Sequence, residues 1–207
     1  MAIDFYTVRG AGGRPRALVV EEFVLRDDFT AAALDSAGFD GSWWSSAAYS
    51  RLLRTDATMP VSPVSRPDAQ EAYRNLGGDR LPPDAVLRER FADRTIFTEV
   101  PPLRLRPDDG RRFYRLLFAR DLDERHLAGL IASLRLSPVD DPRVEDPRVV
   151  ARTVTEQATW ELRRVGGLAW SIDVTSDAAA AVGPLLGAAM ATARGHGLIP
   201  VTVERFA

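Results

Sequence analysis

The stretch from residue 152 to residue 175 alternates apolar and polar residues on both sides of the pair Gly166-Gly167. Four apolar residues after this pair recur at every second position: Leu168, Trp170, Ile172 and Val174. A period of two is typical of a strand with one buried face, and glycine tolerates the positive φ of a tight turn. The stretch therefore predicts an antiparallel hairpin with strands at 152–165 and 168–175.

The same plan, a β-hairpin followed by a helix, can be read three times along the chain. The predicted elements are strands 3–8 and 17–25 with helix 26–38, strands 95–106 and 111–119 with helix 121–136, and strands 152–165 and 168–175 with helix 176–197 and a final strand 198–206. Asp121 and Glu124 are spaced as a capping box for the second helix. This order predicts an α+β protein whose antiparallel sheets carry helices on one face.

Composition predicts how these units are divided into modules. Residues 42–95 read as a helical insertion that begins at an N-cap Ser42 and contains a Pro/Ser-rich loop at 55–67. Residues 137–148 hold three prolines among charged residues, which is typical of a linker. We therefore expect an N-terminal α+β module at 1–136 and a C-terminal ββαβ module at 149–207, packed as one compact domain.

The 207 residues contain no cysteine, and all 27 basic residues are arginine. This composition, which is typical of a GC-rich bacterial genome, excludes thiol chemistry, disulfides and lysine Schiff bases. The two histidines cannot form a His-rich metal site, so we expect no metal and no cofactor. A net charge of -2 argues against nucleic-acid binding. The chain shows neither a signal peptide nor an apolar run long enough for a membrane span, so a cytoplasmic protein without a membrane partner is expected.

Adjacent Trp43 and Trp44 stand in the first turn of the helix predicted to follow Ser42. Neighbouring helix residues point about 100° apart, so the spacing predicts Trp44 inside and Trp43 at an edge. Trp43 would then pack under the proline-containing loop. Alternatively, Phe39, Trp43 and Met59 would wall a pocket with loop 55–67 as its lid.

The stretch WWSSAAYSRLL resembles a helix found in small members of the dimeric α+β-barrel superfamily, with Trp43, Ser46 and Tyr49 at matching positions. The preceding ALVVEEF is similar to the strand before that helix, so the resemblance covers residues 17–54. It implies ferredoxin-like modules and, by extension, the activities of that superfamily, which includes cofactor-free monooxygenases and isomerases.

Two arginine-containing segments suggest other ligands. RGAGGRPR at 9–16 is rich in glycine, but a strand pattern follows it where a phosphate loop would open a helix, which favours a hairpin loop. Arg104, Arg106, Arg112 and Arg115 could form a cationic stripe on the second hairpin, or the ordinary charged face of a sheet exposed to solvent.

Two functions from different classes follow from these features. The first is binding of a small apolar or aromatic molecule, with cofactor-independent oxygenase, isomerase or cyclase chemistry as an open question. In that case Tyr49 would donate a hydrogen bond and His196, near Glu204 or Asp173, would act as the base. The second is a non-catalytic protein that binds a protein partner or forms a homo-oligomer, with Trp43 and Met59 as anchors.

Overall fold

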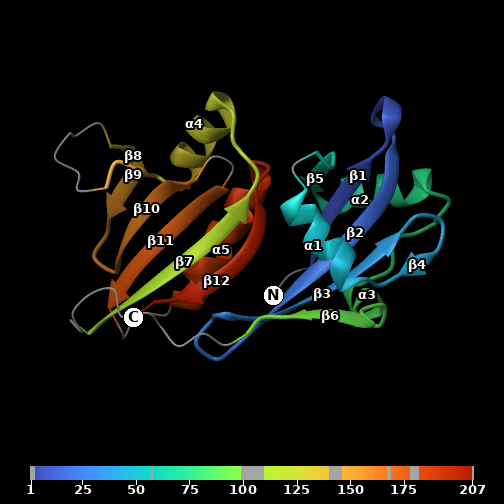
Figure 1. Cartoon of the computed structure of the whole chain (residues 1–207), viewed down its shortest axis with the longest axis horizontal. Helices are drawn as coiled ribbons and strands as arrows, with labels where there is room; N and C mark the ends of the chain where they lie inside the picture. The colour runs from blue at the N-terminus through green and yellow to red at the C-terminus, as the bar shows by residue number, and fades with distance from the viewer. Residues whose placement is uncertain are drawn as a thin grey trace. The chain divides into compact units, whose positions relative to one another are not determined.

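The computed structural model describes residues 3–56, 58–98, 110–139, 146–166, 169–177 and 182–206. The chain divides into two units, the first formed by Met1–Arg26 and Ala31–Thr98 and the second by Asp27–Thr30 and Glu99–Ala207. Each unit contains its own antiparallel sheet with helices (Figure 1). The predicted α+β class with antiparallel sheets is confirmed.

The sheet of the first unit has the strand order β4-β3-β2-β1-β5, and β6 shares the outer edge of β3 with β4. Its strands are β1 (Asp4–Arg9), β2 (Pro15–Leu25), β3 (Ala31–Phe39), β4 (Trp43–Trp44), β5 (Val61–Val64) and β6 (Asp93–Ile96). The first predicted hairpin is confirmed, because β1 and β2 pair across a loop that contains the short 3-10 helix η1 (Ala11–Gly13).

The helix predicted at 26–38 is wrong, because Ala31–Phe39 form the strand β3. Its alanines favour a helix in isolation. However, β3 pairs with β2 along its length and is buried on both faces, so no alternation of apolar and polar residues marks it as a strand.

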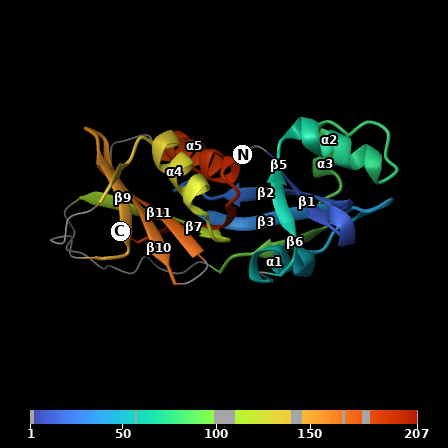
Figure 2. The ribbon, with the colours of Figure 1, turned by 90° about the horizontal axis from the view of Figure 1, so that it is seen from above.

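Helices cover both faces of this sheet, whereas the sequence predicted helices on one face. They are α1 (Ala47–Thr55), α2 (Arg66–Asn75) and α3 (Asp84–Arg88). In Figure 2, α2 and α3 lie on one side of the sheet and α1 lies on the other. On the α2 side, β1 contributes Phe5, β2 contributes Leu18 and Val20, and β3 contributes Phe39 to a core with α2 and Leu87.

Two boundaries in this region differ from the sequence prediction. Trp43 and Trp44 form β4, and α1 begins only after Ser46, whose side chain accepts a hydrogen bond from the Tyr49 N–H. Ser42 is therefore not the N-cap. The expected loop at 55–67 contains β5, which pairs with β1, so it is partly a strand of the sheet.

The sheet of the second unit has the order β12-β7-β11-β10-β9-β8. Its elements are β7 (Arg111–Ala119), α4 (Glu124–Ser133), β8 (Ser137–Pro138), β9 (Val149–Val154), β10 (Ala158–Val165), β11 (Ala169–Asp177), α5 (Val182–Gly195) and β12 (Ile199–Arg205). The β10–β11 hairpin confirms the third predicted hairpin, although 152–165 divides between β9 and β10. The N-cap of α4 is Asp123, not Asp121.

The second predicted hairpin is wrong among the described residues. Strand β6 pairs with β3 in the first unit, whereas β7 pairs with β11 and β12 in the second. Residues 99–109 lie outside the described residues. β7 and α4 belong to the second unit, and the chain passes from the first unit to the second near residue 98.

Helices α4 and α5 lie on one face of the second sheet (Figure 2). That face presents buried apolar side chains of β7 and β11, such as Leu116, Phe118 and Ile172. The opposite face carries ion pairs within and between neighbouring strands. Arg115 lies 2.7 Å from Asp173, and Arg163 contacts both Asp173, at 3.0 Å, and Glu161, at 2.6 Å.

Candidate functional site

Phe39 and Trp43, two of the residues predicted to wall a pocket, lie together but fill the space between them. Their ring centroids are 5.3 Å apart, and the ring of Tyr73 from α2 lies 4.4 Å from Phe39 and 5.8 Å from Trp43. Packed aromatic rings at these distances form a core contact. Tyr73, which the sequence reasoning missed, takes the place expected for a ligand.

Met59 does not join this cluster. It precedes β5, which pairs with β1 at one edge of the sheet, whereas Trp43 belongs to β4 at the other edge. The three strands β3, β2 and β1 separate the two edges. Phe39, Trp43 and Met59 therefore do not line one pocket.

Trp44 and Tyr49 lie on the α1 side of the first sheet. The Trp44 ring lies against Gly38, so closely that a Cβ added to this glycine would be 2.0 Å from a ring carbon. Tyr49 meets Trp44 edge to face, with centroids 4.8 Å apart. Burial raises the pKa of Tyr49, so its phenol stays protonated, and the residue lies in the first unit.

His196 belongs to the second unit, so the structure does not assign the two predicted catalytic residues to one unit. Its Nε2 lies 3.0 Å from the Ser133 hydroxyl of α4, and its ring lies next to Gly129. Desolvation, and to a lesser degree the charge of His126, lowers the pKa of His196. Asp173 and Glu204, its suggested partners, lie on the sheet face that carries the ion pairs with Arg115, opposite the helices.

The predicted arginine stripe does not form within the described residues. Arg112 and Arg115 are three positions apart in β7 and so point to opposite faces of the sheet. Arg115 is paired with Asp173. Arg104 and Arg106 lie outside the described residues.

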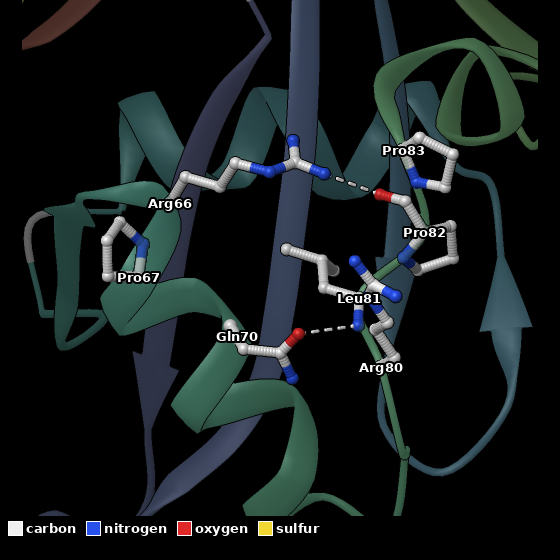
Figure 3. A pocket seen from close by; sticks show the side chains of 7 residues that line it. All are labelled: Arg66, Pro67, Gln70, Arg80, Leu81, Pro82 and Pro83. Carbon is white, nitrogen blue, oxygen red and sulfur yellow. Dashed lines mark hydrogen bonds between the residues drawn. The ribbon is translucent and has the colours of Figure 1, made fainter.

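A groove in the first unit offers a better candidate site (Figure 3). It has a volume of about 590 Å³ and lies between the first turns of α2 and the segment 80–83. The described residues that line it are Arg66, Pro67, Gln70, Arg80, Leu81, Pro82 and Pro83.

Gln70 holds the two walls of this groove together. Its side-chain oxygen accepts a hydrogen bond of 2.9 Å from the Leu81 N–H, and its amide group donates one of 3.1 Å to the Asp79 carbonyl. The ring of each proline fixes φ and stiffens the chain on both sides. The hydrogen bonds of Gln70 and the proline rings therefore restrict the backbone on both sides of the groove.

The two arginines of the groove differ in their partners. Arg66 donates to Asp84 and, at 2.7 Å, to the Pro82 carbonyl, and its guanidinium lies 5.5 Å from the Phe5 ring centroid. Arg80 is exposed, and no hydrogen-bond or ion-pair partner is found for it in the part of the chain that the structure describes. None of the described lining residues is acidic. The groove thus presents the guanidinium of Arg80 next to apolar walls.

The sequence does not predict this groove, because its lining comes from two segments, 66–70 and 80–83, that no local pattern brings together. Within the described residues, no group of three or more His, Asp or Glu side chains is placed to hold a metal ion. None of the helices in the described part of the chain combines the length and the apolar composition that crossing a bilayer requires.

No protein family, no curated protein and no solved structure gives a match to this chain.

Proposed function

We propose that the chain binds a small organic anion with a flat apolar body, and that its site is the groove between α2 and segment 80–83. The observation that carries this proposal is the unpartnered guanidinium of Arg80 in a groove whose described lining contains no acidic side chain. A carboxylate is the natural partner of such a group, because guanidinium matches its geometry with two parallel hydrogen bonds.

The apolar walls support a ligand with a flat body. Pro67, Pro82 and Pro83 offer ring faces, and the volume of about 590 Å³ lies within the range of sites for small molecules. The seven described lining residues carry no carboxylate, imidazole or hydroxyl group that could act as a base or nucleophile. Binding without turnover is therefore the proposal that these residues support.

Benzoate and benzamide test this proposal, because they share a flat ring and differ in charge. Titration by saturation-transfer NMR should show that benzoate binds more tightly than benzamide. Arg80→Gln should weaken benzoate binding by about tenfold or more, since a hydrogen bond to a charged group contributes roughly 1.5–3 kcal/mol. Binding of benzamide should change little in the same variant.

Arg51→Gln is the matched control, because Arg51 is an exposed arginine of α1, on the opposite face of the sheet. It makes the same change of charge and should leave benzoate binding intact. Equal binding of benzoate and benzamide, or equal losses in the two variants, would refute the proposal.

The alternative of a protein partner has less support. In the described part of the chain the large apolar side chains that are strongly exposed are Leu52, Ile96 and Val154. They come from α1, β6 and β9, and only extended apolar patches point to an interface.

We further propose that the second unit is a ferredoxin-like module. The order β12-β7-β11-β10 supports this, with α4 after β7 and α5 between β11 and β12, as in a split β-α-β arrangement extended by β8 and β9. The resemblance of residues 17–54 to the dimeric α+β-barrel superfamily stays a proposal as well.

A further inference from the structure

A second hollow lies in the second unit, on the sheet face opposite the helices. Its volume is about 280 Å³. Thr159 of β10 and Thr175 of β11 are cross-strand partners and lie in it side by side. They share the face of Glu161 and Asp173, two residues further along the same strands.

The charged residues around this hollow balance each other. Arg111 lies 3.5 Å from Asp177, and Arg152 lies 3.6 Å from Glu161. Both distances are longer than the 2.7 Å of the Arg115–Asp173 pair on the same face. Glu156 and Gln157 of the turn between β9 and β10 also line the hollow. The described lining therefore offers hydrogen-bond donors and acceptors. Its two arginines are balanced by two acidic residues, so it has no net charge.

A neutral ligand with many hydroxyl groups suits such a lining. A threonine hydroxyl both donates and accepts hydrogen bonds, as does each hydroxyl of a sugar. An anion would be attracted by the arginines but repelled by Glu156 and Asp177. At ~30 Å³ for each water molecule, the volume corresponds to about nine waters, room enough for one sugar ring.

We infer that this hollow binds a neutral, polyhydroxylated molecule of the size of a monosaccharide, with Thr159 and Thr175 as its floor. The site lies in a different unit from the proposed anion groove and takes a different chemical class of ligand, so each can fail without the other.

D-glucose and myo-inositol are the probes, with inorganic phosphate as an anionic and glycine as a zwitterionic comparator, all titrated against the full chain by saturation-transfer NMR. At least one of the two polyols should bind, and more tightly than phosphate or glycine. Thr159→Val and Thr175→Val should each weaken this binding by about tenfold or more, because valine keeps the shape of threonine but loses the hydroxyl.

Thr153→Val is the matched control, because Thr153 pairs with Trp160 and so points to the helix-covered face of the same sheet. It should leave polyol binding unchanged, as should Arg80→Gln in the first unit. Near-UV circular dichroism confirms that each variant folds. Absence of polyol binding, tighter binding of phosphate or glycine, or an equal loss in Thr153→Val would overturn the inference.

Discussion

Glu21 is the most deeply buried charged residue that the structure describes in the first unit. It is 0% exposed in the middle of β2, where its carboxylate accepts a hydrogen bond of 2.5 Å from Ser50 and lies 2.6 Å from the Arg54 guanidinium. Burial opposes the charge of Arg54, but the adjacent Glu21 carboxylate outweighs it and raises the pKa of Arg54. The pair attaches α1 to the sheet through charges that water does not screen.

Glu21→Gln should lower the free energy of unfolding by about 3 kcal/mol, because it removes the carboxylate charge that lies 2.6 Å from the buried Arg54 guanidinium. Urea denaturation measures this loss. The neighbouring Glu22→Gln is the control, since Glu22 pairs with the half-exposed Arg88 and should cost no more than about 1 kcal/mol. A loss for Glu21→Gln no larger than that for Glu22→Gln would show that the buried pair contributes little.

For single residues, the sequence predicted which way a side chain points better than it predicted which residues that side chain contacts. Trp43 and Trp44 do point to different faces, although as neighbours in a strand, and both are partly buried. The role proposed for Arg80 could not be predicted, because 27 identical side chains differ only in what lies next to them in space. The partners of an arginine such as Arg54 come from residues far away in the sequence.

At the scale of elements, predictions held where a segment carries its own signal. The β10–β11 hairpin has alternating residues and a glycine at its turn, and both are local features. The strand β3 lacks such a signal, because its small residues are enclosed by α1 on one face and by the core with α2 on the other. Tertiary contacts decided its structure over helix propensity.

The start of α1 can be tested by removing its cap. Ser46→Ala should lower the free energy of unfolding by about 1 kcal/mol, because the Tyr49 N–H loses its hydrogen-bond acceptor. Ser42→Ala, at an exposed position before β4, should change it by no more than about 0.5 kcal/mol. Thermal or urea unfolding of both variants distinguishes them. A larger loss for Ser42→Ala would support the helix start that the sequence predicted.

At the scale of the whole molecule, the division into units depends on pairings between distant parts of the chain. β7 pairs with β12 some 80 residues later, and β1 pairs with β5 more than 50 residues later. No period within a segment reports such pairings, so the sequence alone does not assign residues 111–136 to one unit or the other. Strand β8, at the start of the segment expected as a linker, belongs to the sheet of the second unit.

The pH dependence of stability is a property of the whole molecule that His196 should influence. Its pKa is lowered below 6.5 in the folded state, so the unfolded chain binds a proton more readily. The free energy of unfolding should therefore fall as the pH drops from 6.5 towards the folded pKa, and should be unaffected by His196 above about pH 7.5.

His196→Gln should flatten this part of the profile when urea unfolding is compared with that of the unaltered chain from about pH 7.5 to pH 5.5. Ser133→Ala keeps the histidine and should preserve the slope, because desolvation is the main cause of the lowered pKa. An unchanged slope in His196→Gln would assign the pH dependence to other groups.

The short segment Asp27–Thr30 joins β2 to β3 of the first unit but belongs to the second, where the Phe29 ring lies against Gly183. A single break in the chain near residue 98 therefore cannot yield two intact halves. The N-terminal fragment would contain Asp27–Thr30, which belong to the second unit. The C-terminal fragment would lack Phe29, so Gly183 would lose its aromatic neighbour. We therefore expect a fragment of the second unit to need Asp27–Thr30 added to it.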